Sequence, residues 1–336
     1  MKASPLVVMF SLCAGILIVN AEGGFLNWTS PTTNILTSVY MVNATDGWAV
    51  GYNGAIIRWN GTDWNNVISP TTEHLESVYM VNATEGWAVG DNGTIIRWNG
   101  LIWQNVANPA TDLLHSVFMV NATDGWVMGQ SGTIIRWNGT DWTTVLSPTT
   151  ETLMSVYMVN ATDGWAVGIT GWAPTMIRWD GTDWSKATSP TTHSLYSVFM
   201  VNASDGWAVG AVGTVIHWNG TEWSHITSFP TTILESVYMV NATDGWAVGL
   251  YGKIIHWNGT IWSTPTSPTT EHLESVYMVN ATEGWAVGYV GEIIRWTGSN
   301  WIIPEFPTII PISLLTSLTL VAVIIVKTAS KRRKNL

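Results

Sequence analysis

The stretch that decides the fold is SVYMVNATDGWAVGYNGAIIRWNGTDW, residues 38–64, and it is the first of seven near-copies along the chain. The tryptophan of its Gly-Trp pair recurs every 39 residues, except for one step of 42 that contains an insertion around residues 171–174. A repeat of about 40 residues with four short apolar segments has the length and pattern of one propeller blade. This first tryptophan column is Trp48, Trp87, Trp126, Trp165, Trp207, Trp246 and Trp285.

Each repeat divides into four segments with strand character. In the first copy they are residues 38–42, 48–51, 55–59 and 64–68, separated by Asp-Gly, Asn-Gly and similar turn sequences. Such pairs between β-branched or aromatic runs favour tight hairpins, because these turns need a positive φ. The inner segments are apolar without interruption, as in a sheet that is covered on both faces. The sequence therefore predicts an all-β, seven-bladed propeller of four-stranded antiparallel blades over residues 22–303, forming one monomeric ring.

Two further tryptophan columns run in phase with the first. Aromatic side chains bury roughly 150–250 Å² each, so all three columns are first of all candidate core residues. The outer column is also a candidate for stacking on sugar rings, because it lies on the outer strand, and Trp172 in the insertion is a further candidate. The middle column is Trp59, Trp98, Trp137, Trp179, Trp218, Trp257 and Trp296. The outer column is Trp64, Trp103, Trp142, Trp184, Trp223, Trp262 and Trp301.

The repeat also carries a family resemblance. Val-Asn-Ala-Thr-Asp-Gly-Trp-Ala-Val-Gly at residues 42–51, then Asn-Gly-x-Ile-Ile and a Gly-Thr-Asp-Trp turn, resembles the repeat of photosystem II assembly-factor-like propellers. It is similar, more widely, to BNR (Asp-box) and WD40/YVTN-like repeats. An Asp-box would place aspartate two residues before Gly61, where this chain has Trp59. The resemblance implies a propeller fold and neither a photosynthetic role nor glycosidase chemistry.

The charge of the chain is unevenly distributed. The net charge is −10, but six of the 13 basic residues and only two of the 23 acidic residues lie outside the repeats, which leaves the ring at about −14. Surfaces that bind nucleic acid are basic. We therefore expect no nucleic-acid partner.

The N-terminal residues 1–21 are typical of a secretory signal peptide. Lys2 precedes an apolar run at residues 6–19, and Val-Asn-Ala at 19–21 offers small residues for cleavage. The only cysteine, Cys13, lies inside that run. The mature chain would then contain no disulfide, and its stability would come from packing between blades.

The C-terminus predicts a membrane tether. Residues 308–326 form a charge-free, mostly apolar run of 19 residues, long enough to span a bilayer as a helix. The basic tail at 327–336 would stay in the cytoplasm by the positive-inside rule, with the ring outside. Together with Pro304, Glu305, Phe306 and Pro307, this ending resembles the PEF-type sorting signals of archaeal surface proteins, in which the helix is exchanged for a lipid. The alternative is a permanent single-span anchor, which recovery of mature peptides through Lys327 would establish.

Thirteen Asn-x-Ser/Thr sequons suggest N-glycosylation, although Asn, Gly and Thr are also ordinary turn residues. In a four-stranded meander the first and third turns share one edge, while the second turn and the inter-blade linker share the other. Most sequons fall in first and third turns, so we expect glycans on that face and ligands on the face of the Ser-Pro-Thr-Thr linkers. The candidates are Asn27, Asn43, Asn60, Asn82, Asn92, Asn121, Asn138, Asn160, Asn202, Asn219, Asn241, Asn258 and Asn280, of which Asn92 breaks the pattern.

An acidic residue precedes the first-column Gly-Trp pair of every blade, and a basic residue precedes every middle-column tryptophan. Hairpin pairing around the second turn would place Gly47 roughly opposite Arg58 and Asp46 beside it. We interpret these charges as structural cross-strand pairs, each contributing about 0.2–1 kcal/mol, rather than as binding pockets. Four of them are Asp46 with Arg58, Glu85 with Arg97, Asp124 with Arg136, and Asp163 with Arg178.

The sequence contains no Gly-rich phosphate loop, no Gly-x-Ser-x-Gly elbow and no His-Glu-x-x-His motif, so we expect no cofactor. Glu-His-Leu-Glu occurs at 73–76 and 271–274, but equivalent positions hold unrelated residues, and we expect solvated loops there with no metal. Because nearly every residue type comes in sevens, we expect no catalytic residues. The one asymmetric feature is residues 169–174, which include Trp172.

These observations predict an exported, membrane-tethered propeller on an archaeal cell surface, acting as a non-catalytic interaction or adhesion scaffold. Its partner would be a surface protein or a glycan. The alternative is a multivalent, lectin-like carbohydrate-binding propeller, and a glycosidase-like enzyme is a distant third.

Overall fold

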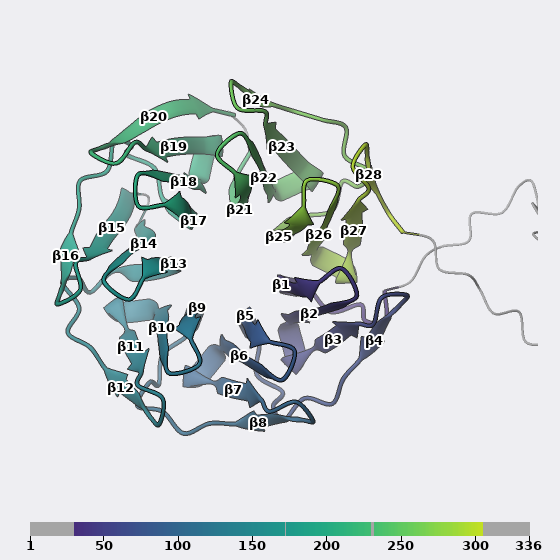
Figure 1. Ribbon diagram of the computed structural model, residues 1–336, viewed down its shortest axis with the longest axis horizontal. Coiled ribbons are helices and arrows are strands. Elements are labelled where there is room, and N and C mark those ends of the chain that lie inside the picture. The colour runs from purple at the N-terminus through teal and green to yellow at the C-terminus, as the bar shows by residue number, and fades with distance from the viewer. Residues whose placement is uncertain (1–29, 172, 230–231, 305–336) are drawn as a thin grey trace, which may run out of the picture.

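The computed structural model describes residues 30–171, 173–229 and 232–304. They form seven four-stranded antiparallel sheets arranged as blades around a central axis (Figure 1). Within each blade the strands pair in chain order, so every blade is a simple meander. The predicted seven-bladed propeller is confirmed.

The blades share one set of element bounds. The inner strands are β1 (Leu36–Asn43), β5 (Leu75–Asn82), β9 (Leu114–Asn121), β13 (Thr152–Asn160), β17 (Leu195–Asn202), β21 (Leu234–Asn241) and β25 (Leu273–Asn280). The second strands are β2 (Asp46–Gly51), β6 (Glu85–Gly90), β10 (Asp124–Gly129), β14 (Asp163–Thr170), β18 (Asp205–Gly210), β22 (Asp244–Gly249) and β26 (Glu283–Gly288).

The third strands are β3 (Ile56–Trp59), β7 (Ile95–Trp98), β11 (Ile134–Trp137), β15 (Ala173–Trp179), β19 (Thr214–Trp218), β23 (Lys253–Trp257) and β27 (Ile293–Trp296). The outer strands are β4 (Trp64–Asn66), β8 (Trp103–Asn105), β12 (Trp142–Thr144), β16 (Trp184–Lys186), β20 (Trp223–Ser228), β24 (Trp262–Ser263) and β28 (Trp301–Ile302). Short 3-10 turns join second to third strands in every blade but the fourth: η1 (Tyr52–Gly54), η2 (Asp91–Gly93), η3 (Gln130–Gly132), η4 (Ala211–Gly213), η5 (Leu250–Gly252) and η6 (Tyr289–Gly291).

The core lies between blades rather than within them. Trp48 of blade 1 is fully buried against Trp98 and Trp103 of blade 2, with ring centroids 4.7 and 5.4 Å away. Equivalent clusters form at all seven blade junctions. Each blade therefore buries its first-column tryptophan under the middle and outer tryptophans of the next blade, which explains why the three columns recur together.

The ring closes by side-chain packing between blade 7 and blade 1. Blade 7 takes all four strands from one continuous segment, β25 to β28, and no N-terminal strand among the residues from 30 onward joins this sheet. Trp285 of blade 7 packs against Trp59 and Trp64 of blade 1, at 4.8 and 5.5 Å between ring centroids. Closure thus repeats the contact made at every other junction.

A column of serines adds a polar contact to each junction. The Val39 backbone N–H donates to the Ser275 hydroxyl across the closure at 3.2 Å, and Val78 donates to Ser38 at 3.1 Å. Inner strands have one edge without a strand partner, and a buried N–H without an acceptor is costly. The serine hydroxyl of one blade supplies that acceptor for the next blade. The same bond recurs at the other five junctions.

Several predictions for the ends of the chain lie outside the described residues. These are the signal peptide at 1–21, the apolar run at 308–326, the basic tail at 327–336, and the Glu305, Phe306 and Pro307 part of the sorting motif. Within residues 30–171, 173–229 and 232–304, the structure has no helix that is both long and apolar enough to span a membrane.

Candidate functional site: an axial funnel

The two faces of the ring are distinguished by their turns. Gly61 in the third turn of blade 1 lies beside Thr45 in the first turn, since an added Cβ would be 3.1 Å from the Thr45 Cβ. Gly54 in the second turn lies instead against the following linker, since a Cβ added there would be 2.1 Å from the Thr71 carbonyl oxygen. The predicted sharing of edges is therefore correct. We call the side with second turns and linkers the linker face, and the opposite side the first-turn face.

Seven side chains converge on the axis near the linker face. Each lies immediately before the serine described above, and in every blade it coincides with a shift of register between the first and second strands. A β-bulge re-aims a side chain, and here the side chains line a cavity of about 160 Å³ on the axis, which we call the funnel. The seven residues are Thr37, Glu76, His115, Met154, Tyr196, Glu235 and Glu274.

The funnel is acidic. Burial raises the pKa of Glu235 to about 7. Burial also raises the pKa of Glu76 to about 7, with the Asp91 and Glu274 charges adding to the effect. The pKa of Glu274 is raised to about 7 by burial and then by the charge of Glu235. Near neutral pH these carboxyl groups therefore exchange protons readily and carry only part of their full negative charge.

The other funnel residues are neutral near pH 7. Burial lowers the pKa of His115 to about 4, and its Nε2 is inaccessible to solvent without a hydrogen-bond partner. Burial raises the pKa of the Tyr196 hydroxyl. The Thr37 hydroxyl donates to the Leu75 carbonyl at 2.6 Å and so joins two blades. The negative charge of the funnel is thus not balanced by a cation of its own.

A closed ring of aromatic side chains lies three residues further along the inner strands. Neighbouring rings are tilted, with centroids 4.7–5.0 Å apart at all seven steps around the axis. Burial raises the pKa of the Tyr40 and Tyr277 hydroxyls, so they stay neutral. This ring separates the funnel from the first-turn face. Its members are Tyr40, Tyr79, Phe118, Tyr157, Phe199, Tyr238 and Tyr277.

Aromatic residues also stand around the mouth of the funnel. Tyr52 stacks on His74 at 4.1 Å between centroids. His272 contacts both Tyr251 and Tyr289, at 4.9 and 4.7 Å. Burial raises the pKa of Tyr289, and the nearby charges of Glu274 and Glu235 raise it further. The rim on blades 6, 7 and 1 therefore combines aromatic rings with carboxylates.

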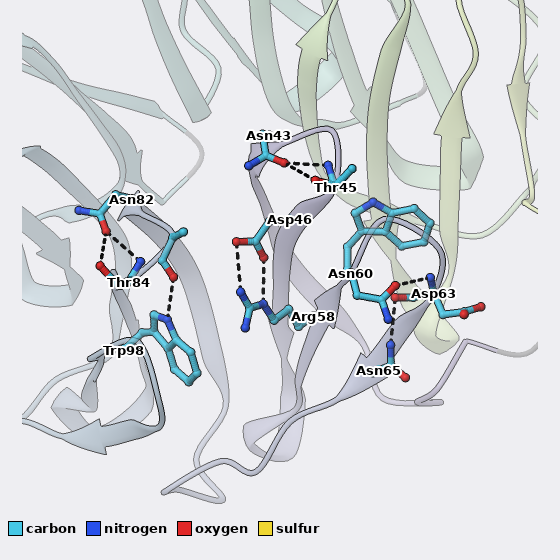
Figure 2. A network of polar contacts seen from close by, with 12 residues as sticks. Asn43, Thr45, Asp46, Arg58, Asn60, Asp63, Asn65, Asn82, Thr84 and Trp98 are labelled. Atoms are coloured by element: carbon cyan, nitrogen blue, oxygen red, sulfur yellow. Dashed lines mark hydrogen bonds and ion pairs between the residues drawn. The ribbon is translucent and has the colours of Figure 1, made fainter.

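The predicted charge pairs form, with one correction of register. Figure 2 shows Arg58 donating to both carboxylate oxygens of Asp46, at 2.9 and 3.2 Å. Arg58 stands opposite Trp48, however, and not opposite Gly47, so the pair is diagonal across the two strands. This register also places the guanidinium 4.8 Å from the centre of the Trp48 ring, a cation–π contact.

The same pair recurs in every blade. The other three predicted pairs, Glu85–Arg97, Asp124–Arg136 and Asp163–Arg178, are all present. Blades 5 and 6 use histidine in place of arginine, and blade 7 uses arginine again: His217–Asp205, His256–Asp244 and Arg295–Glu283. A contact made seven times under a tryptophan ring fits the structural interpretation. None of these pairs lines the funnel.

The outer tryptophan column is part of the core. The side chains of Trp64, Trp103, Trp142, Trp184, Trp223, Trp262 and Trp301 are only 3–8% exposed. Trp64, for example, contacts Trp59 of its own blade and Trp285 of the neighbouring blade. A ring in that position has no free face for a sugar, which removes the column as a set of stacking contacts. Trp172, the other candidate, lies outside the described residues.

The described sequon asparagines are all exposed, but they differ in hydrogen bonding. In the first turns the asparagine Oδ1 accepts bonds from the threonine or serine two residues later; Thr45 bonds Asn43 in this way at 2.8 Å (Figure 2). Third-turn asparagines such as Asn60 also accept through Oδ1. Asn92 on the linker face instead uses its Nδ2 to donate to Glu73 at 2.7 Å. Asn27 lies outside the described residues.

The funnel corrects two expectations from the sequence. Glu76 and Glu274 are the last residues of the two Glu-His-Leu-Glu stretches, and they belong to inner strands that line the cavity rather than to solvated loops. The residues at 169–174 are not the only break in the repeat, because the funnel position differs between most blades. That variation before an invariant serine is a sequence signal that marks the position as unusual, although it does not show that the side chain lines the axis. No group of three His, Cys, Asp or Glu residues in the described part of the chain could hold a metal ion.

Comparison with known proteins identifies the architecture. The sequence matches no protein-family model and no curated protein. Solved structures with the same fold include YCF48 bound to D1 peptide, with a TM-score of 0.67 and 15% identity, covering 81% of this chain and 98% of the other. YCF48 from Cyanidioschyzon merolae has a TM-score of 0.67 and 16% sequence identity, and the match covers 80% of this chain and 98% of the other. The WD40 propeller domain of Doa1 has a TM-score of 0.69 and 10% sequence identity, and the match covers 80% of this chain and 94% of the other. At these identities the likeness establishes a shared seven-bladed fold.

Proposed function

We propose that this protein is a non-catalytic interaction scaffold, exported and tethered to the outer face of an archaeal cell membrane, that holds a protein partner on the linker face of its ring. The observation that carries the proposal is the funnel. It is lined at equivalent positions by seven side chains of five residue types, whereas the surrounding serines and tryptophans are repeated unchanged. Because this one position varies between blades while its neighbours repeat, the variation gives the funnel an uneven lining that a partner could recognise.

The comparisons support a peptide-holding role. A propeller of the same architecture was solved with a peptide bound, namely YCF48 with D1 peptide. In this proposal the N-terminal residues 1–21 direct export and residues 304–336 provide the tether, either as a retained helix or as a lipid that replaces it. Glycans would cover the first-turn face and leave the linker face free.

A photo-crosslinking experiment in cells tests which face binds. Benzoylphenylalanine is placed at Ser131 on the linker face or at Asp141 on the first-turn face, both exposed positions of blade 3. We expect a discrete protein adduct from the position at Ser131 and none from Asp141. Adducts formed only from Asp141, or from neither position, would contradict the proposed function.

Glycopeptide mapping of the protein from its native host tests the assignment of faces. We expect occupancy at first-turn and third-turn sequons, such as Asn43 and Asn60, because their side chains are exposed and use Oδ1 as an acceptor. We expect none at Asn92, because its Nδ2 is bonded to Glu73. Occupancy at Asn92 equal to that at Asn43 would show that glycosylation does not separate the faces.

A further inference from the structure

The tips of the second turns carry an unusual set of residues on one side of the ring. The central residue of each 3-10 turn has a positive φ, between 54° and 58°. Blades 1, 2 and 3 place Asn53, Asn92 and Ser131 there, and asparagine in particular tolerates this conformation. Blades 5, 6 and 7 place Val212, Tyr251 and Val290 there. A β-branched or bulky residue at positive φ is strained.

The strained side chains are exposed. Val212, Tyr251 and Val290 are 43%, 69% and 62% accessible to solvent. They stand on three consecutive blades and form what we call the apolar arc of the linker face. Asparagine is present at the same position in two sister blades, so an unstrained alternative exists within the same repeat. Backbone strain at residues whose side chains stay exposed to solvent indicates that these side chains contact another molecule.

The apolar arc adjoins the acidic part of the funnel. Glu235 and Glu274 come from the inner strands of blades 6 and 7, which also carry Tyr251 and Val290. Tyr289, next to Val290 in the chain, is close enough to both carboxylates for their charges to raise its pKa. Apolar contacts and unbalanced negative charge therefore meet at one edge of the funnel mouth.

None of the seven cross-strand ion pairs described above includes a funnel carboxylate. Within residues 30–171, 173–229 and 232–304, no basic group is among the charges that shift the pKa of Glu76, Glu235 or Glu274. Lys253 is the lysine nearest in sequence to Glu235 and Glu274. Its ammonium group donates to the Thr264 hydroxyl at 3.3 Å and lies 5.1 Å from the centre of the Phe229 ring. A partner that supplies a positive charge would complete the funnel.

We propose that the apolar arc and the funnel mouth together bind an extended segment of a partner protein, which inserts an arginine or lysine side chain between Glu235 and Glu274 and lays apolar neighbours on Val212, Tyr251 and Val290. The inference rests on the proposed function, and it specifies the chemistry of the partner. A cavity of about 160 Å³ admits the end of one long side chain rather than a folded element. Tyr52 and Tyr289 lie close enough to the funnel carboxylates to interact with them electrostatically, so aromatic rings, which attract cations, stand near the same charge.

Binding of a defined peptide to the full-length chain in mild detergent tests this inference. The probe is a capped, fluorescent Leu-Val-Arg-Val-Leu peptide, and its control replaces arginine by citrulline, which has nearly the same shape without the charge. We expect the arginine peptide to bind at least tenfold more tightly. In a Glu76→Gln, Glu235→Gln, Glu274→Gln variant the two peptides should bind alike, because no funnel carboxylate remains to attract the charge.

A second variant separates recognition from folding. Replacing Val212, Tyr251 and Val290 together by asparagine should weaken binding of both peptides at least tenfold while raising the midpoint of thermal unfolding, because strain is relieved. If these side chains served only to stabilise the fold, their replacement would lower the unfolding midpoint and would not combine weaker peptide binding with higher stability. As a control, Asp141→Asn, Asp183→Asn, Glu222→Gln removes three exposed charges from the opposite face and should leave binding unchanged.

Equal affinity for the arginine and citrulline peptides, or full binding by the triple asparagine variant, would overturn the inference. That result would not touch the proposed function, provided that crosslinking from the position of Ser131 still identifies a partner. Loss of linker-face crosslinks would instead refute the proposed function itself.

Discussion

Replacing Gly90 by alanine is expected to destabilise the ring by at least about 3 kcal/mol, at the upper end of overpacking effects. The added Cβ would lie 1.8 Å from the His74 carbonyl oxygen and 2.8 Å from the His74 carbonyl carbon. Both are backbone atoms, so no rotamer change can relieve the clash. The φ of Gly90 is −176°, which any residue can adopt, and the restriction is therefore one of space alone.

The close approach at Gly90 has an identifiable cause. The next residue, Asp91, donates its backbone N–H to the His74 carbonyl at 2.9 Å, and this bond fixes the second turn to the start of the inner strand beside the bulge at Glu76. Every blade has a glycine at the equivalent position. An alanine at Gly90 would separate the turn from the strand and displace a funnel residue along with it.

Gly171→Ala is the matched control for this prediction. Gly171 has a φ of +61° but no atom within 4 Å of an added Cβ. Its replacement should cost only the left-handed backbone penalty of roughly 1–2 kcal/mol. Denaturant unfolding followed by tryptophan fluorescence compares the two variants. If Gly90→Ala proves as stable as Gly171→Ala, the backbone contact at His74 is not a constraint on the fold.

The fold could be predicted from the sequence because its determinants are local and repeated. Asp46-Gly47 and the Asn-Gly pairs fix the turns, and the spacing of Trp48, Trp59 and Trp64 fixes the blade. The number of blades then follows from counting copies. The register around Arg58 was misplaced by one residue, because turn sequences locate a hairpin without specifying its pairing.

The funnel could not be predicted in the same way. Glu76 reads as part of a polar stretch after a linker, and only the bulge between Leu75 and Ser77 turns it toward the axis. A bulge depends on how two strands pair, which residue types alone do not reveal. The role of Ser38 could not be predicted for a related reason. Its hydroxyl accepts a hydrogen bond from the backbone N–H of Val78, which lies in the next blade, 40 residues further along the chain.

Replacing Glu76, Glu235 and Glu274 together by glutamine is expected to stabilise the ring at pH 8 by several kcal/mol. Burial is the main cause that raises the pKa of each carboxyl group from 4.5 to about 7. One pKa unit corresponds to about 1.4 kcal/mol, so each ionised carboxylate costs up to about 3 kcal/mol in the folded ring. Glutamine keeps the size of the side chain and removes that cost.

The sign of the pH dependence follows from proton linkage. Because the folded pKa values lie above the unfolded value, the folded ring holds protons that the unfolded chain has released. The stability contributed by these groups is complete below about pH 4.5, and it is lost as the pH rises through about 7. His115 and Tyr196 line the funnel with these carboxyl groups, and Asp91, Tyr52 and Tyr289 lie near enough to interact with them electrostatically. None of the five supplies a compensating positive charge at pH 7–8.

Thermal or denaturant unfolding of the wild type and the triple glutamine variant at pH 5 and pH 8 measures this effect. We expect similar stability at pH 5 and a clear advantage for the variant at pH 8. The control with Asp141→Asn, Asp183→Asn, Glu222→Gln should differ from the wild type by no more than about 0.5 kcal/mol at either pH, as expected for exposed positions. A wild type that gains stability relative to the glutamine variant between pH 5 and pH 8 would show that the funnel carboxylates are stabilised within the ring. In that case the ionised carboxylates would not destabilise the folded ring, and a cationic partner would have no such destabilisation to relieve.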